Sequence, residues 1–137
     1  MQTGRPVLLV PKGTDATPTR HIAIGWDGEL AAARALTAAL PLLERAASVE
    51  LLLADTIDAA KIGAGEAIAY LALHGVTARA RTVGGATQPG AALLHAAEAA
   101  DLLVMGAYGH SRIVERLFGG VTAYVVAHAR QPVLMLH

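Results

Sequence analysis

Residues 101–122, DLLVMGAYGHSRIVERLFGGVT, give the clearest indication of how this chain folds. Their apolar run at 102–105 contains no polar residue, which predicts a strand buried on both faces, as in a parallel sheet. Glycines follow the run at Gly106 and Gly109, and a stretch with helical spacing of apolar residues begins at Val121. The segment therefore predicts a strand, a glycine-rich loop and a helix, in that order.

The glycines of this segment have the arrangement of an anion-binding loop. Gly106, Gly109 and Gly119 follow the spacing Gly-x2-Gly-x9-Gly between the expected strand and helix. Glycine lets the backbone approach a ligand closely, and the N–H groups at a helix N-terminus attract negative charge. The spacing differs from both GxGxxG and GxxxxGK[ST]. The alternative is that these glycines only turn the chain from the sheet into the helix.

With this spacing the segment resembles the nucleotide-binding loop of the universal stress protein family, in which the third glycine is followed by Ser or Thr. The three glycines match that pattern, whereas Gly120 stands where the family has the hydroxyl residue. The tail HARQPVLML, at 128–136, also resembles the final helix-to-strand passage of the family. The resemblance extends from about residue 20 to the end of the chain.

Apolar strand-like runs alternate with helix-like segments along the rest of the chain, which predicts an α/β fold with a doubly wound open parallel sheet. The resemblance adds that the sheet has five strands in the order 3-2-1-4-5, in an adenine-nucleotide alpha-hydrolase-like fold. We expect strands at residues 21–25, 49–54, 76–83, 102–105 and 132–136 and helices at residues 29–45, 58–74, 88–99 and 121–129.

An apolar run near the N-terminus repeats the end of the chain. RPVLLVP, at 5–11, and RQPVLML, at 130–136, share the motif Pro-Val-Leu. The resembling family includes tandem forms, whose two copies each end in such a strand. We therefore interpret residues 1–19 as a leftover edge strand with its linker, and residues 20–137 as a universal stress protein domain similar to the C-terminal domain of a tandem member. The alternative is an ordinary N-terminal edge strand.

The final strand is expected to mediate assembly. Family members usually form a homodimer through this strand, here residues 132–136, because an apolar strand edge is open to pairing. We also expect residues 5–11 to pair antiparallel with it, in the same chain or in a partner, and so to contribute to the dimer contact.

The resemblance implies that the ligand is an adenine nucleotide, ATP with Mg²⁺ as an optional companion. Trp26 and Asp27 would flank the adenosine, Ala54 and Asp55 would line the adenine pocket, and the two glycine segments would approach the ribose and phosphates. The cofactor-binding residues expected in this way are Trp26, Asp27, Ala54, Met105, Gly106, Tyr108, Gly109, Gly119, Gly120, Val121 and Thr122.

Several of these residues have an alternative role. Asp27 is suited to cap the helix that follows it, because a carboxylate accepts hydrogen bonds from free N–H groups. Met105 is also suited to core packing. The indole of Trp26 either stacks on adenine or fills the pocket and excludes it. Gly120 lacks a hydroxyl donor, which weakens phosphate binding by about 1–2 kcal/mol, roughly tenfold in affinity. Thr122, two positions further on, is a candidate replacement donor.

Composition excludes several other functions. The 11 basic and 11 acidic residues balance, which argues against electrostatic binding to nucleic acid or to an anionic membrane surface. No apolar stretch of about 20 residues predicts a membrane span, and no signal peptide is evident. The absence of cysteine excludes thiol catalysis and cysteine-based metal sites, and agrees with a cytoplasmic location.

No catalytic constellation stands out. The six histidines show no metal-ligand spacing, and although His110 adjoins Ser111, no third group that would orient them is identifiable. The resemblance implies a stress-response regulatory module that binds an adenine nucleotide and has at most slow ATP hydrolysis. The alternative is a dimerisation or protein-interaction module of the same fold that binds no nucleotide.

Overall fold

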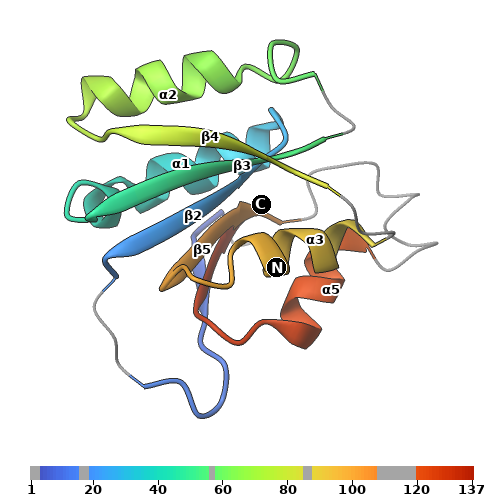
Figure 1. Cartoon of the computed structure of the whole chain (residues 1–137). Coiled ribbons are helices and arrows are strands. Elements are labelled where there is room, and N and C mark those ends of the chain that lie inside the picture. Colours follow the sequence, from blue (N-terminus) through green and yellow to red (C-terminus); the bar gives the residue numbers. More distant parts are fainter. Residues whose placement is uncertain (1–3, 16–18, 56–57, 85–87, 108–119) are drawn as a thin grey trace.

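Six strands form a single sheet in the computed structural model, which describes residues 4–15, 19–55, 58–84, 88–107 and 120–137 (Figure 1). The strands are β1 (Val7–Leu9), β2 (His21–Trp26), β3 (Ser48–Ala54), β4 (Ala78–Val83), β5 (Leu102–Gly106) and β6 (Val133–Leu136). Their order is β1-β6-β5-β2-β3-β4, and every neighbouring pair is parallel except β1 and β6. Counted from β2, this is the order 3-2-1-4-5 with β1 added at one edge.

Helices cover both faces of the sheet, which confirms the predicted α/β class. They are α1 (Leu30–Leu43), α2 (Ala64–Leu73), α3 (Pro89–Ala96) and α5 (Gly120–His128). Residues of α1 and α2 join one buried aliphatic cluster, and residues of α3 and α5 join a second cluster on the opposite face. Because each strand sends alternate side chains to opposite faces, the apolar runs of the sequence supply both clusters.

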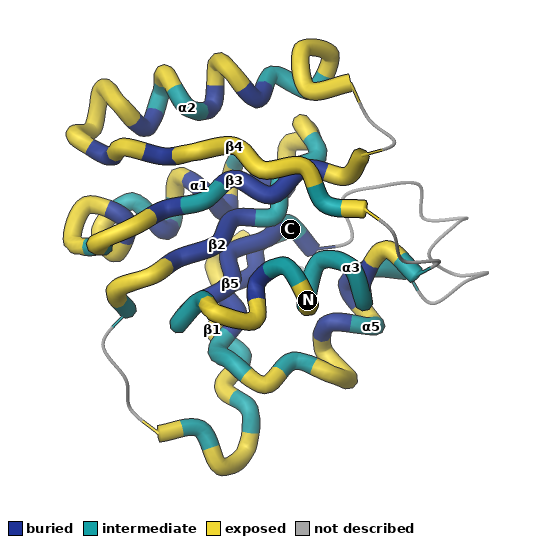
Figure 2. The backbone as a smooth tube through the Cα atoms, viewed as in Figure 1, coloured by how far each residue is buried: buried dark blue, intermediate teal, exposed yellow. Residues whose placement is uncertain are grey.

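The centre of the sheet is the most deeply buried part of the molecule (Figure 2). Ile24 of β2 lies opposite Leu51 on one side and Val104 on the other, and all three are fully buried. The four apolar residues of β5 are also buried, as the uninterrupted run at 102–105 predicted. Sheet and helices are thus held together by aliphatic packing.

Three helices are shorter than the sequence suggests. The helix expected at 58–74 begins only at Ala64, because the Asp58 carboxylate accepts a hydrogen bond from the Ala60 N–H group at 3.0 Å and holds the chain in turns. At its other end, Gly75 has a φ of +75°, as expected for a C′ glycine. The helix expected at 88–99 spans Pro89–Ala96, with Gln88 as its N-cap.

The helix expected at 29–45 spans Leu30–Leu43. Pro41 lies inside its last turn and does not end it. Proline has no N–H group at this position, so the carbonyl of Thr37 lacks the hydrogen bond that the helix would otherwise give it.

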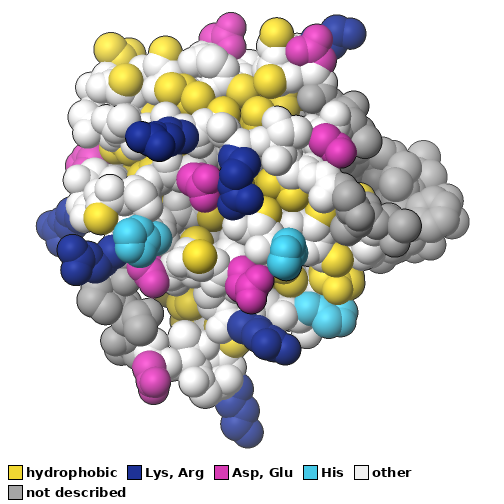
Figure 3. All heavy atoms as spheres, in the orientation of Figure 1, with side chains coloured by type: hydrophobic (Ala, Val, Ile, Leu, Met, Phe, Trp, Pro, Cys, Tyr) yellow, Lys and Arg dark blue, Asp and Glu magenta, His cyan; other side chains and the backbone are white. Residues whose placement is uncertain are grey.

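Surface charges of both signs alternate on the face seen in Figure 3. An ion pair joins two neighbouring strands: Arg81 of β4 and Glu50 of β3, with Nε and Oε2 2.9 Å apart. Arg81 also donates to the backbone carbonyl of Ala96, at 2.7 Å, and so connects the edge of the sheet to the end of α3. Within the described ranges, no helix is long and apolar enough to cross a membrane.

The N-terminal segment adds the sixth strand. Of the expected strand at 5–11, the structure contains Val7–Leu9, which pairs antiparallel with β6 of the same chain. The predicted pairing is therefore confirmed within one chain. Arg5 and Pro11 lie outside the paired segment.

The packing predicts a large difference between two leucines. Leu51→Ala removes a side chain that is fully buried in β3, and should lower the free energy of unfolding by about 2–5 kcal/mol. Leu73→Ala is the matched control, because Leu73 is 87% exposed and should change stability by no more than about 0.5 kcal/mol. Urea unfolding followed by circular dichroism measures both, and equal effects would contradict this account of the core.

Candidate functional site

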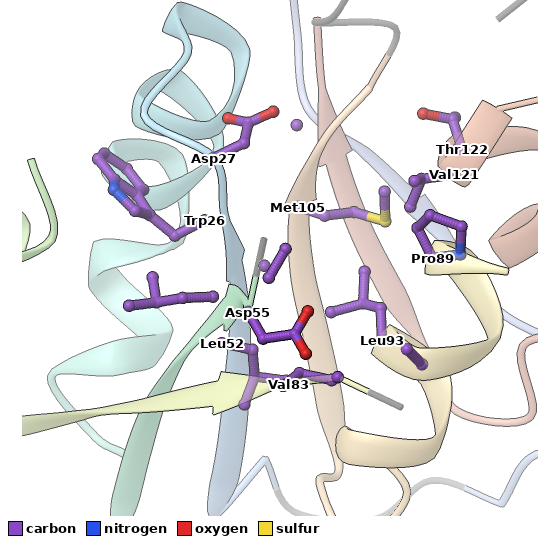
Figure 4. A pocket seen from close by; sticks show the side chains of 16 residues that line it. Trp26, Asp27, Leu52, Asp55, Val83, Pro89, Leu93, Met105, Val121 and Thr122 are labelled. Atoms are coloured by element: carbon purple, nitrogen blue, oxygen red, sulfur yellow. The ribbon is translucent and has the colours of Figure 1, made fainter. Parts of the chain in front are cut away.

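A hollow of about 240 Å³ opens where β2, β3, β4 and β5 end, and is completed by the starts of α3 and α5 (Figure 4). Within the sheet, β2 lies between β3 and β5. The chain first adds β3 and β4 on one side of β2, and then returns to add β5 and β6 on the other side of β2. Parallel α/β sheets bind ligands at the carboxyl ends of their strands, at such a reversal of strand order. The hollow is therefore in the position where the fold favours a ligand.

The floor of the hollow is apolar. Leu52, Leu93 and Met105 line it, together with Val83 at the end of β4. Gly25 lets this floor lie close to the backbone of β2, because a Cβ atom in its place would be in van der Waals contact with Leu93 Cδ2, at 3.4 Å, and with Met105 Cβ, at 3.6 Å. A flat apolar group, such as an aromatic base, is the kind of ligand that such a surface accommodates.

Trp26 lines the hollow without filling it. Its indole N–H group donates a hydrogen bond to the backbone carbonyl of Ile62 at 2.7 Å. In Figure 4 the ring points away from Met105 and Leu93, towards the side of the sheet that α1 and α2 cover. The pocket is therefore not blocked by the indole. The ring also faces away from the space in which stacking on adenine was expected.

Asp27 lies at the mouth of the hollow and does not cap α1. The helix begins at Leu30 with Glu29 as its N-cap, and Asp27 instead accepts a hydrogen bond from the Glu29 N–H group at 2.9 Å. The expectation of a helix cap is thus wrong: the carboxylate stabilises the turn that precedes the helix. In Figure 4, Asp27 and Thr122 lie on opposite sides of the opening.

A second carboxylate, Asp55, lies at the other end of the hollow. Its backbone N–H group continues the pairing of β3 with β4 by donating to the carbonyl of Val83 at 2.9 Å. The carboxylate packs so closely against Gly84 that a Cβ atom on this glycine would overlap it. The hollow thus combines an apolar floor with two acidic side chains at its margin, Asp27 and Asp55.

The glycine segment meets the hollow from the β5 side. Gly106 lines it, but this glycine also has a structural role, since a Cβ atom there would lie 2.6 Å from the Ala32 nitrogen at the start of α1. Gly120 begins α5 with a φ of +55°, in the left-handed region that favours glycine, and is not among the residues that line the hollow. Val121 and Thr122 do line it, and Thr122 is buried.

Eight of the residues predicted from the sequence therefore come together around one hollow: Trp26, Asp27, Ala54, Asp55, Met105, Gly106, Val121 and Thr122. Tyr108, Gly109 and Gly119 lie outside the described residues, as do His110 and Ser111. Sequence reasoning missed the contributions of Val83, Pro89 and Leu93. Val83 is the last residue of a strand and Pro89 is the first residue of the helix that follows. Their places in the sequence could therefore have predicted that both lie at the carboxyl edge of the sheet.

Among the residues that the structure describes, no group of three or more His, Asp or Glu side chains is arranged to hold a metal ion.

The model of the universal stress protein family matches residues 13–137. The chain belongs to the universal stress protein family. No curated protein matches this member in sequence. The solved structures it resembles include a universal stress protein in complex with cAMP, at 27% identity and a TM-score of 0.66, over 88% of this chain and 99% of that one.

Two further structures share the fold. A universal stress protein from Archaeoglobus fulgidus DSM 4304 has a TM-score of 0.73 and 18% identity, and the match covers 97% of this chain but 50% of that one. A universal stress protein family protein from Arabidopsis thaliana with AMP bound has a TM-score of 0.57 and 17% identity, over 85% of this chain and 89% of that one.

The close approach at Gly106 gives a prediction for this universal stress protein. Gly106→Ala should lower the free energy of unfolding by about 1–3 kcal/mol, because the new methyl group meets the backbone of Ala31 and Ala32. Gly65→Ala, in α2, is the control: nothing lies within 4 Å of the added carbon, and stability should rise by about 0.5 kcal/mol. Chemical denaturation measures both, and a neutral Gly106→Ala would show that α1 does not pack against this glycine.

Proposed function

We propose that this universal stress protein binds an adenine nucleotide in the hollow and acts as a stress-response regulatory module. The observation that carries the proposal is the open apolar floor at the reversal of strand order, with the start of α5 beside it. The structures with cAMP and with AMP bound support this ligand class.

The adenine ring would lie on the apolar floor, between Leu93 on one side and Leu52 and Val83 on the other. Burial of a flat aromatic ring against aliphatic side chains is favourable because both surfaces leave water. The Asp55 carboxylate, at this end of the hollow, is suited to accept a hydrogen bond from an exocyclic amino group. This arrangement would favour adenine over a base that presents a carbonyl oxygen at the same position.

The phosphates would lie at the opposite end, near Gly106 and the first turn of α5. That helix has nine residues and contributes backbone N–H groups and a positive partial charge at its start. Asp27, across the opening, would meet the ribose, whose hydroxyl groups can donate to a carboxylate. For ATP, Mg²⁺ would offset part of the repulsion between the phosphates and Asp27.

We further propose residues 20–137 as the nucleotide-binding unit, with residues 1–19 as an additional strand and linker outside it. The cytoplasm is the proposed location, because adenine nucleotides are abundant there.

A filled pocket should weaken nucleotide binding. Ala92 lines the hollow from α3, so Ala92→Trp would place an indole in the space proposed for adenine. His95→Trp is the control on the same helix, since the His95 side chain is 85% exposed. Isothermal titration with ATP, AMP and cAMP should give at least a tenfold loss for Ala92→Trp and no change for His95→Trp.

The wild-type titration decides between the proposal and its alternative. If no nucleotide is released on denaturation and none binds at millimolar concentration, the proposal is wrong and a protein-interaction module of the same fold is favoured. Equal binding by both tryptophan variants would place the nucleotide elsewhere on the molecule.

Gly120 gives a second test of phosphate binding. Gly120→Ser adds a hydroxyl donor at the start of α5, next to the lining residues Val121 and Thr122, and ATP affinity should rise by roughly tenfold if the phosphates lie there. The positive φ at this position should at the same time lower the free energy of unfolding by about 1–2 kcal/mol, because a side chain is strained in the left-handed region. Ala123→Ser, on an exposed position of α5, should change neither quantity. A gain in affinity for Ala123→Ser as well would contradict a specific contact.

A further inference from the structure

One of the two carboxylates at the hollow has no partner among the described residues. The Asp55 side chain makes no ion pair with any residue that the structure describes, and accepts no hydrogen bond from one. Asp27, by contrast, already accepts a hydrogen bond from the Glu29 N–H group. In Figure 4 the Asp55 carboxylate points across the hollow towards Leu93. Both oxygen atoms of Asp55 can therefore accept hydrogen bonds from a ligand that lies on the apolar floor.

Two contacts determine where this carboxylate lies. The Asp55 N–H group donates to the Val83 carbonyl at 2.9 Å, which fixes the backbone at the end of β3. Gly84, the residue after β4, leaves room for the side chain, because a Cβ atom on this glycine would overlap the Asp55 carboxylate. Asp55 and Gly84 both line the hollow. Any residue larger than glycine at position 84 would therefore displace the carboxylate from its place in the hollow.

An ionised carboxylate offers a base only hydrogen-bond acceptors. Adenine presents its 6-amino donor between two ring nitrogens that are acceptors, so only one carboxylate oxygen can be paired with it. Guanine presents two adjacent donors, the N1–H group and the 2-amino group, and each can donate to one of the two oxygens. Paired hydrogen bonds to a charged group are among the strongest that proteins make. Of the two purines, guanine therefore has the edge that matches the Asp55 carboxylate.

The rest of the hollow is suited to either purine. Leu52, Val83 and Leu93 offer apolar contacts, and such contacts do not distinguish two flat ring systems of nearly the same size. A carbonyl oxygen that faced Asp55 would be repelled. Guanine avoids this repulsion when its N1–H and 2-amino groups face the carboxylate, because its carbonyl oxygen then lies to one side. The choice between the bases is thus left to Asp55.

We propose that the hollow also binds guanine nucleotides, with the N1–H and 2-amino groups of the base donating to the two oxygens of Asp55, and that Gly84 holds this carboxylate in position. The inference rests on the function proposed above, because it places the base on the same apolar floor. It adds a second base to the ligands of the site, and it assigns the distinction between the bases to one side chain.

Three mononucleotides that differ only in the base test the proposal on the full-length chain. Isothermal titration of the wild type should give a GMP affinity equal to that for AMP within about threefold, or higher. IMP should bind at least tenfold more weakly than GMP, because it has the same N1–H and carbonyl groups but lacks the 2-amino group.

Equal binding of IMP and GMP would overturn the proposed contact. Binding of AMP without GMP would overturn this inference and leave the proposed function in place. Binding of neither nucleotide would overturn both.

Asp55→Asn exchanges one acceptor for a donor in a side chain of the same shape. The GMP affinity should fall at least tenfold, because a donor then faces a donor. The AMP affinity should rise by about threefold, because an amide can pair with both the 6-amino group and the neighbouring ring nitrogen. Loss of a negative charge alone would change both affinities in the same direction, so opposite changes identify a contact with the base.

Asp27→Asn is the matched control. It removes the other carboxylate of the hollow, which is placed at the ribose, and should change the GMP and AMP affinities by the same factor. If Asp55→Asn also changes both affinities by one factor, the carboxylate does not read the base and the proposal is wrong.

Gly84→Ala moves the carboxylate and keeps its charge. The GMP affinity should fall at least tenfold and the AMP affinity by less, since guanine loses two hydrogen bonds and adenine loses one. Gly65→Ala should change neither affinity, because nothing lies within 4 Å of the added carbon. Circular dichroism checks that each variant is folded. Equal losses for both nucleotides, or no loss in folded Gly84→Ala, would overturn the role given to Gly84.

Discussion

The structure depends on the burial of β2 between β3 and β5. This strand pairs in parallel with both neighbours, and its side chains enter the aliphatic clusters on both faces of the sheet. Since a parallel strand in this position is closed to water on every side, its polar backbone groups are satisfied only by correct register with both partners. The same register brings Gly25 and Met105 side by side, and so places the hollow.

The architecture follows from the sequence because the signals for it are local. Uninterrupted apolar runs predicted the buried strands, and their alternation with helical segments predicted a parallel sheet. The helix starts were less predictable, since they depend on side chains that compete for the backbone. Asp58 holds its own turn, and Asp27 binds the Glu29 N–H group two residues ahead of itself.

The sequence predicted which strand ends meet at the site, but it did not predict the directions in which the side chains there point. Asp27, Met105 and Thr122 come together because they end strands or begin a helix at one edge of the sheet. The direction of the Trp26 ring depends on a carbonyl 36 positions away, which no local pattern reports. Gly106 is another such case, because its neighbour is the start of α1 and not a residue nearby in the sequence.

The hydrogen bond between Trp26 and Ile62 has an optical consequence. The only indole of the chain is anchored to the segment just before α2, on the far side of β2 from the apolar floor. Its fluorescence therefore reports on the polarity around that anchoring carbonyl and on the docking of the segment. A change in emission wavelength would be a measure of how firmly this outer layer is attached.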